Sequence, residues 1–303
     1  MTPLSQKILN DFQTRKTFKQ KSIFIALLQE HFPDMIVEEC GFPKCRNLIV
    51  GDLEKAKVIL CAHYDTCAQL PFPNFIMPKK PVLSILYSIL LLIPIFLGVF
   101  LLNLLLSLFT DSYWVHYWLS MAGYLALLFL MIAGPANKHT ANDNTSGVIT
   151  LCELIQVLTP ALRNKAAFIF FDHEETGLLG SSNFRSRHKQ LAKEKLIINF
   201  DCVSDGDYIM VSVSKQANIE FETLLKSSFL PGMGKKILFT NAEKTYYPSD
   251  QVGFRKAVAV AALKRKLFAD YCIDKIHTAK DTCFDKTNIK FLCERIRHLL
   301  ECI

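Results

Sequence analysis

Three short runs decide the fold: Lys57–His63 (KVILCAH), Ala166–Asp172 (AAFIFFD) and Lys195–Asp201 (KLIINFD). All three are apolar and rich in β-branched or aromatic residues, which is typical of parallel strands buried on both faces. Between the first two runs lies Thr145–Leu158 (TSGVITLCELIQVL), which predicts a helix with a threonine or serine near its cap. Strands that alternate with helices predict an α/β fold, an open and mostly parallel sheet with helices on both faces.

The chain outside its middle continues this alternation. We predict an amphipathic helix over Ser5–His31 and a closing helix over Lys286–Cys302. Further strands are expected at Tyr208–Ser214, Lys235–Thr240 and Ala257–Leu263. The length of 303 residues is enough for one large domain or two small ones.

Two apolar stretches dominate the middle of the chain, 82–109 and 114–134, and neither contains Asp, Glu, Lys or Arg. Each has the roughly 20 residues that a helix needs to cross a bilayer core. A buried hairpin in a soluble core is the alternative, but core helices are usually apolar on one face, whereas these are apolar all round. The Tyr and Trp residues of 113–118 stand where an interfacial aromatic belt would lie. The pattern therefore favours two helices in a lipid bilayer.

This hairpin divides the chain and sets its orientation. We expect residues 81–134 to form an inserted transmembrane hairpin, and residues 1–80 and 135–303 to form one discontinuous domain. Lys79-Lys80 precede the first stretch and Lys138 follows the second, whereas the turn between the stretches has no Lys or Arg. By the positive-inside rule, both outer ends and the domain face the cytoplasm.

Polar side chains follow the predicted strands at the point where each strand ends. His63 and Asp65 follow the first strand, Glu174-Glu175 follow the second, and Asp201 closes the third. In open α/β sheets, ligands bind at the carboxyl ends of the strands. Asp143 lies in the loop that opens the next helix, and His277 lies in a polar loop after the last strands. These side chains are therefore expected at one edge of the sheet.

Five of these residues form a potential ligand set for two zinc ions: His63, Asp143, Glu175, Asp201 and His277. Zinc takes His nitrogen and carboxylate oxygen, and catalytic sites leave one position for water. Asp143 could bridge a pair of ions roughly 3.5–4 Å apart, and such a pair activates water and polarises a carbonyl. Asp65 lies two residues beyond His63, where it could hold the imidazole.

The motifs around these residues resemble metallopeptidase family 28, which includes di-zinc aminopeptidases, glutamate carboxypeptidase II and glutaminyl cyclases. The resemblance covers the chain outside the hairpin and rests on motifs in the family's order: HYDT (63–66), NDNTSG (142–147), EETGLLGS (174–181), the strand-closing Asp201 and His277-Thr278. It implies that Asp143 bridges two zinc ions, that His63 and Asp201 share one ion, and that Glu175 and His277 share the other.

The resemblance also implies that Glu174 is the general base and that Asp65 is the aspartate behind the first histidine. The chain departs from the family in three places. The hairpin lengthens the gap between the first two ligands. Gln251 stands where the family usually carries His, so this segment is left out of the predicted site. His173 fills a position that is usually small, and it is assigned no role.

The sequence thus predicts a membrane-anchored zinc-dependent hydrolase, and the resemblance implies a peptidase, an aminopeptidase that acts on peptides with a free N-terminus. Glu174 would take a proton from the attacking water and give one to the leaving amine. A glutaminyl cyclase-like acyltransferase and a catalytically inactive membrane scaffold stay open as alternatives. The full set of ligands fits two metals better than one, and the matching ligand and base positions are all retained. The sequence predicts no particular oligomeric state.

Composition excludes other classes. The net charge is +7 with scattered Lys and Arg, so nucleic-acid binding is not expected. The ten cysteines show no C-x-x-C pairs, which argues against a zinc finger. The polar N-terminus lacks the apolar run of a secretory signal, so we expect reduced, mostly buried thiols.

Overall fold

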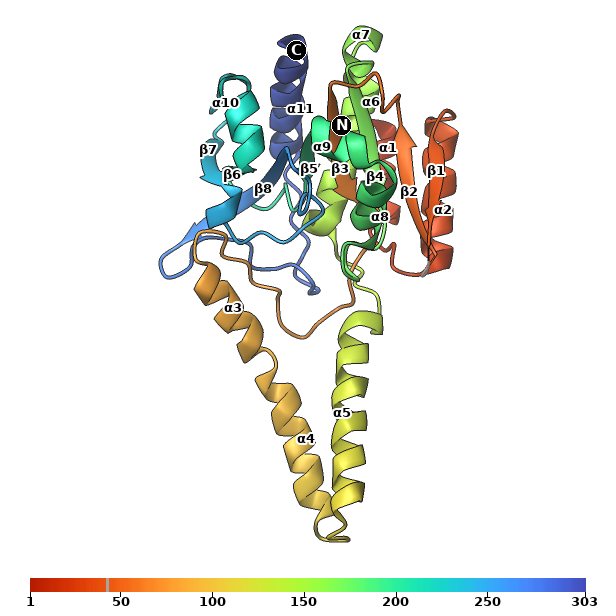
Figure 1. Cartoon of the computed structure of the whole chain (residues 1–303), viewed down its shortest axis with the longest axis vertical. Coiled ribbons are helices and arrows are strands. Elements are labelled where there is room, and N and C mark those ends of the chain that lie inside the picture. Colours follow the sequence, from red (N-terminus) through yellow and green to blue (C-terminus); the bar gives the residue numbers. More distant parts are fainter. Residues whose placement is uncertain (42–43) are drawn as a thin grey trace.

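The computed structural model describes residues 1–41 and 44–303, and it shows an α/β domain from which a helical hairpin projects (Figure 1). The strands are β1 (Ile36–Cys40), β2 (Cys45–Val50), β3 (Val58–His63), β4 (Ala166–Phe171), β5 (Leu196–Phe200), β6 (Tyr208–Val213), β7 (Lys236–Asn241), β8 (Ala257–Lys266) and β9 (Asp270–Cys272). The helices of the domain are α1 (Pro3–Asp11), α2 (Phe18–His31), η1 (Ala141–Ser146), α6 (Gly147–Val157), α7 (Pro160–Arg163), α8 (Leu179–Arg187), α9 (Lys189–Glu194), α10 (Lys215–Ser228), η2 (Ala242–Lys244) and α11 (Lys286–Glu301).

The strands form one mixed sheet in the order β1-β2-β4-β3-β5-β8-β6-β7, with β9 paired to β8. The four central strands β4, β3, β5 and β8 are parallel to one another, and β3, β4 and β5 are buried along their whole length. The predicted α/β class is confirmed, and parallel pairing also joins β6 to β7. Antiparallel pairs join β1 to β2, β2 to β4, and β6 to β8.

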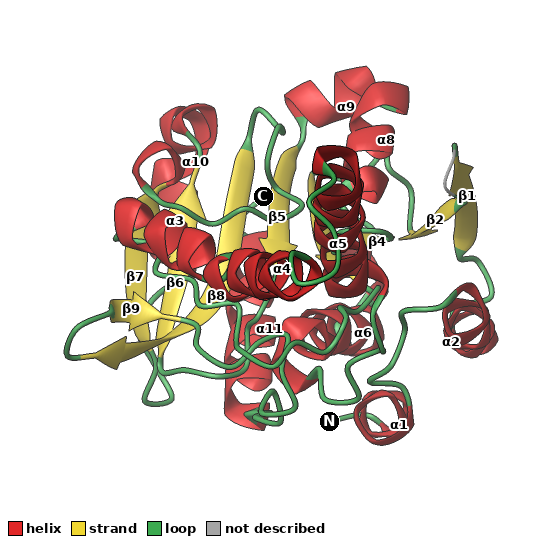
Figure 2. Cartoon of the chain, turned by 90° about the horizontal axis from the view of Figure 1, so that it is seen from below, coloured by secondary structure: helices red, strands yellow, loops and turns green. Residues whose placement is uncertain are grey.

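Alternate residues of β3 lie in two hydrophobic cores on opposite faces of the sheet. Leu60 and Ala62 of β3 face the larger core, which α1, α2, α6, α10 and α11 cover. Ile59 and Cys61 face the opposite core, which α8 and α9 cover through Phe184 and Ala192. Figure 2 shows α6 and α11 on one side of the sheet and α8 and α9 on the other. Helices therefore lie on both faces, as predicted.

Three local features differ from the sequence expectations. Residues 5–31 form two helices, because the chain breaks after α1 and α2 starts again with a capping box between Thr17 and Gln20. The β1–β2 hairpin at the sheet edge was not predicted. Cys40 and Cys45, which face each other across it, form a disulfide, whereas the other eight cysteines are free. The expectation of reduced thiols is thus wrong for this pair.

The apolar middle of the chain forms α3 (Pro81–Leu90), α4 (Ile93–Leu106) and α5 (Tyr113–Ala133). The first stretch is interrupted at residues 91–92, because Pro94 has no N–H to donate to the Leu90 carbonyl and its ring crowds that carbonyl. The helices are almost entirely exposed, and both apolar spans, Pro81–Leu106 and Tyr113–Ala133, are long enough to cross a membrane. Asn103 Oδ1 lies 2.9 Å from His116 Nδ1, and Asn103 Nδ2 donates to Ser120 Oγ (2.7 Å). Hydrogen bonds between polar side chains therefore join α4 to α5.

The insertion leaves the domain through a narrow neck, formed by residues 67–69 and 135–137. Gln69 N donates to the Pro135 carbonyl (2.8 Å) and Asn137 N donates to the Cys67 carbonyl (3.1 Å). Ala68 and Ala136 form an antiparallel bridge between them. Beyond the neck, residues 70–80 pack along the domain, where Ile76 pairs with Ile273. The two connections to the hairpin therefore start side by side.

Candidate metal centre

The central strands bring three of the predicted ligands to one edge of the sheet. His63 is the last residue of β3, which lies between β4 and β5. Glu174 and Glu175 follow β4, and Asp201 directly follows β5. Parallel neighbours end at the same edge, so these side chains converge, as the strand pattern predicted.

Two further ligands reach this edge from loops. Asp143 lies in η1, where its backbone angles leave the helical region. His277 lies in the loop after β9 in a left-handed conformation (φ 63°). Asn144 supplies the cap that α6 needs, since its Oδ1 accepts from Gly147 N at 2.9 Å. The hydroxyl of Ser146, at the cap position itself, instead donates to the Asn142 carbonyl.

The ligands form two groups that share Asp143. Asp143 Oδ1 lies 3.4 Å from His63 Nε2, and Asp143 Oδ2 lies 3.1 Å from His277 Nε2. His63 Nε2 also lies 3.5 Å from Asp201 Oδ1, and His277 Nε2 lies 3.2 Å from Glu175 Oε2. Each carboxylate oxygen of Asp143 thus faces a different histidine, and each histidine faces a carboxylate of its own.

The His63 ring is oriented by Asp65. Its Nδ1 lies 3.1 Å from the Asp65 carbonyl oxygen and 3.6 Å from Asp65 Oδ1. Because a carbonyl oxygen can only accept, Nδ1 carries the proton in the neutral ring, and Nε2 directs its lone pair toward Asp143 and Asp201. This is the tautomer that a metal ligand needs.

Two buried carboxylates fix the backbone beneath the ligands. Asp65 accepts from Glu174 N (3.0 Å) and Glu175 N (3.2 Å), one with each oxygen. Asp281 accepts in the same way from Asn142 N (2.9 Å) and Asp143 N (3.0 Å). Asp65 therefore holds both the first histidine and the glutamate pair. Asp281, which the sequence analysis missed, holds the residue shared by the two groups.

The charges of the cluster oppose one another. Burial raises the pKa of Glu175 to about 8, against the opposing effect of His277. Burial by itself lowers the pKa of His277, but Glu175 and Asp143 outweigh it and raise that pKa to about 9. Burial also favours the neutral form of Asp143, yet its bonds to His277 and His63 hold its pKa below the usual range. Such a concentration of buried acids is what cations would stabilise.

The donor set fits divalent cations of the zinc type. Buried oxygens Glu175 Oε1 and Asp201 Oδ1 have no hydrogen-bond partner in the described part of the chain. Unpaired buried acceptors are costly, and a cation would satisfy them. Nitrogen from two histidines and oxygen from three carboxylates are zinc donors. His63, Asp143 and Asp201 could hold one ion, and His277, Asp143 and Glu175 a second.

Other groups near the ligands were not assigned from the sequence. Cys67 Sγ lies within 4.8 Å of ligand atoms of Glu175 and His277, and Cys202 Sγ does so for Asp143 and Asp201. Burial raises the pKa of both thiols, which keeps them neutral and makes them weaker donors than the carboxylates. Asp250, from the segment left out of the prediction, is fully buried, and burial raises its pKa to about 7.

A small cavity of about 80 Å³ opens beside the second group. Its walls include Asp65, Glu175, His277, Lys16, Met131 and Ile132. The first three belong to the candidate centre. Met131 and Ile132 belong to the last turn of α5, so the inserted hairpin contributes directly to the wall of this cavity.

Comparison with known proteins identifies the family. The model of peptidase family M28 matches residues 120–299, more than half of the chain. The chain belongs to peptidase family M28. The match contains Asp143, Glu174, Glu175, Asp201 and His277, and it starts within α5, after His63 and Asp65. The resemblance seen in the sequence motifs is thereby confirmed.

Individual relatives of this M28 chain are distant. Probable leucine aminopeptidase 2 of Aspergillus oryzae is 34% identical over 82 residues, which are 26% of this chain and 16% of that protein. The LapA aminopeptidase of Legionella pneumophila has a TM-score of 0.56 at 12% identity, covering 98% of this chain and 67% of the other. The glutaminyl cyclase of Porphyromonas gingivalis has a TM-score of 0.57 at 16% identity, and the match covers 99% of this chain and 96% of the cyclase chain. These two structures show a shared fold.

Proposed function

We propose that this chain is a membrane-anchored zinc peptidase that removes residues from the free N-terminus of peptides. The observation that carries the proposal is the position of Asp143, whose two oxygens face His277 and His63 separately. A carboxylate placed in this way suits a bridge between two ions, and family membership supports peptide hydrolysis. The similarity to two aminopeptidases favours the N-terminal specificity.

Different residues have different roles in the proposed hydrolysis. When bound, zinc would supply Lewis-acid polarisation of the scissile carbonyl and lower the pKa of water. The family resemblance assigns Glu174 as the general base, and its carboxylate lies within 4.8 Å of ligand atoms of His63 and Asp201, beside the first ion, whereas Glu175 pairs with His277. Glu174 takes a proton from the attacking water and passes it to the leaving amine. Asp65 keeps Glu174 in place through the backbone bond described above.

Membrane anchoring rests on α3, α4 and α5. The most apolar 18-residue windows of their two spans have mean hydropathies of 2.9 and 1.7, and at most 6% of either window is buried. Exposed apolar surface of this extent is unfavourable in water and favourable in lipid. Lys79, Lys80 and Lys138 flank the spans on the side of the domain, which supports a cytoplasmic domain.

The deciding experiment combines metal analysis with an activity assay. The full chain is purified in detergent, its zinc content is measured, and it is given aminoacyl reporters and the same compounds with blocked N-termini. We expect two zinc ions per chain, cleavage of the free reporters alone, and loss of activity with a chelator that added zinc restores. One tightly bound zinc with cyclisation of N-terminal glutamine would instead identify a glutaminyl cyclase. Absence of any turnover in the zinc-loaded chain would support the inactive scaffold.

A further inference from the structure

The hairpin and the candidate centre share one edge of the domain. The insertion begins shortly after His63, at the carboxyl end of β3, and ends shortly before Asp143. Figure 1 shows α3, α4 and α5 leaving the domain at this end, and Figure 2 shows them in front of the sheet when it is viewed from there. If the hairpin lies in a bilayer, the ligand-bearing edge faces that bilayer.

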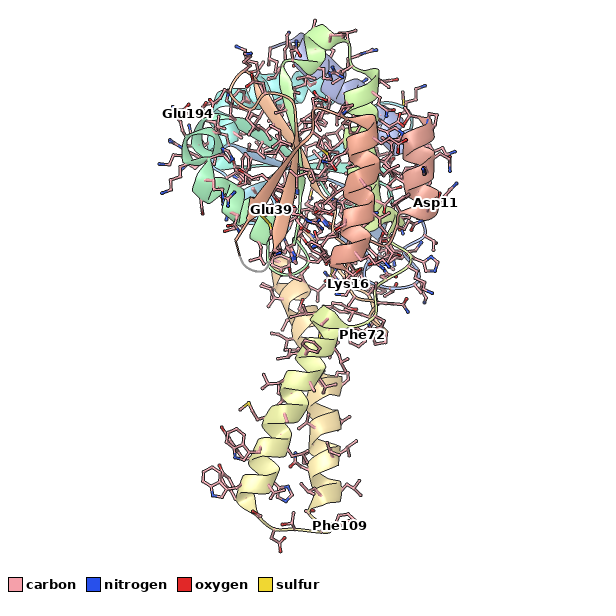
Figure 3. The ribbon with its side chains drawn as sticks, turned by 90° about the vertical axis from the view of Figure 1, so that its right-hand side faces the viewer. Asp11, Lys16, Glu39, Phe72, Phe109 and Glu194 are labelled. Carbon is pink, nitrogen blue, oxygen red and sulfur yellow. A yellow bond between two sulfur atoms is a disulfide. The ribbon has the colours of Figure 1, made fainter. Side chains whose placement is uncertain are left out.

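The entrance to the centre lies at the end of α5. With 21 residues, α5 is about 32 Å long, close to the roughly 30 Å of a bilayer core. Met131 and Ile132, in its last turn, form part of the cavity that contains Glu175 and His277. Lys16 Nζ donates to the Ile132 carbonyl, which ties the α1–α2 loop to this turn. In Figure 3, Lys16 and Phe72 lie beside the near end of the hairpin, whereas Phe109 lies at its far tip.

A second apolar feature lies at the same level, the β8–β9 tip formed by Leu267 and Phe268. These side chains are 90% and 85% exposed. Lys80, the residue before α3, donates from Nζ to the Phe268 carbonyl (2.8 Å), so the tip lies beside the start of the first apolar span. Exposed Arg265, which is paired with Asp270 (3.7 Å), and exposed Lys79, which lies over the ring of Tyr271 in β9, flank it. Apolar side chains beside cations, continuous with a membrane span, fit the surface of an anionic bilayer.

We propose that the substrate of this centre is a peptide presented at the bilayer surface, the free N-terminus of a polypeptide that is itself held in the membrane. The proposal rests on the peptidase function proposed above. The hairpin and the β8–β9 tip hold the domain at separate points, with the cavity entrance facing the lipid. A terminus that emerges from the bilayer then meets the entrance within a few residues.

The test is a series of linker lengths. A domain of this size has a diameter of roughly 45 Å. An extended linker of about 6 residues spans roughly 20 Å, so it reaches an entrance at the bilayer surface but cannot reach around the domain. The full chain is placed in nanodiscs of phosphatidylcholine and phosphatidylglycerol. Each disc also holds a single-helix substrate, whose cleavable N-terminus is joined to the helix by linkers of about 6, 15 or 30 residues. The soluble N-terminal peptide is assayed in parallel.

We expect the shortest linker to be cleaved at a rate within about threefold of the longest, since both reach the entrance. Cleavage limited to the longest linker would overturn the proposal, because it would place the entrance away from the bilayer. Failure to cleave any substrate, including the soluble peptide, would instead count against the peptidase function itself. The two failures are thus distinguishable.

A double substitution, Leu267→Ser with Phe268→Ser, measures the contribution of the tip. We expect the shortest-linker rate to fall severalfold while the soluble-peptide and longest-linker rates stay unchanged. This result would support the tip as a bilayer contact. Equal rates for wild type and variant across the series would remove the tip from the proposal, and the linker series alone would then decide the substrate class.

Discussion

Asp143 lies where the two halves of the proposed zinc site meet, and its two oxygens face different histidines. We expect Asp143→Ala to lose both zinc ions, because neither group keeps its shared ligand. His63→Ala and His277→Ala should each retain about one ion, since each removes a ligand from one group. Zinc analysis of the three purified variants checks this. An Asp143→Ala protein that still bound two ions tightly would contradict the bridging role.

Substitutions of the neighbouring residues Glu174 and Glu175 should have different effects on zinc affinity and on kcat. Glu175→Ala should lower zinc affinity, and excess zinc should partly restore activity. Glu174→Gln preserves shape but cannot accept a proton, so its kcat should fall by roughly 10²–10⁴-fold with both ions kept. Measurements of kcat and zinc content, with and without added zinc, separate the two roles. Loss of metal in Glu174→Gln with retention in Glu175→Ala would reverse the assignment.

At the scale of residues, the side chains proposed as ligands could be predicted from the sequence better than the residues that support them. His63, Glu175 and Asp201 could be found because strand ends have a recognisable apolar run before them. Asp281 could not, because its partners are the backbone N–H groups of residues 142 and 143. Every non-proline residue offers such a group, so the contact leaves no pattern in the sequence.

At the scale of elements, a buried ion pair attaches α2 to the end of β4. Lys21 Nζ lies 2.7 Å from Asp172 Oδ1, and their side chains are 3% and 0% exposed. The other oxygen, Asp172 Oδ2, accepts from Arg46 N of β2 (3.0 Å). The pair thus joins three elements just before the glutamates of the site.

We expect Lys21→Ala to lower the free energy of unfolding by about 3–5 kcal/mol, because it leaves the Asp172 charge buried without its partner. Lys19→Ala, on the exposed side of the same helix, is the matched control and should change it by less than about 0.5 kcal/mol. Denaturant unfolding of the detergent-solubilised proteins measures both. Equal stabilities for the two variants would show that the pair does not stabilise the fold.

Predictability among elements followed the length of the apolar runs in the sequence. The central strands have continuous apolar runs, so β3, β4 and β5 were predicted within a residue or two. The edge hairpin β1–β2 was missed because β1 is partly exposed and carries Glu38 and Glu39, and because β2, although buried, has only three consecutive apolar residues, Leu48 to Val50. The break between α1 and α2 was also missed. It depends on the fully buried Arg15, which donates from Nε to the Tyr64 carbonyl, a contact across the fold that local periodicity does not encode.

At the scale of the whole molecule, the hairpin predicts a definite topology. Reporter fusions at both termini should be cytoplasmic, and a reporter in the 107–112 turn should lie across the membrane. Detergent, and not alkaline carbonate, should extract the protein. Extraction by carbonate, or a cytoplasmic turn, would contradict the transmembrane hairpin.

The neck between residues 67–69 and 135–137 also has a practical consequence for producing the protein. Because the neck is closed by its own hydrogen bonds, residues 81–130 can be replaced by a flexible Gly/Ser linker without cutting a strand of the sheet, and Met131 and Ile132 of the cavity wall are kept. Residues 70–80 must stay, since Leu70 N donates to the His277 carbonyl (2.8 Å). We expect the shortened chain to be folded in detergent-free buffer and to bind two zinc ions that raise its melting temperature. Its cleavage of soluble peptides should be undiminished. Its thermal unfolding with and without zinc, and its elution without detergent, would check this, and an aggregated product would show that the domain needs its anchor to fold.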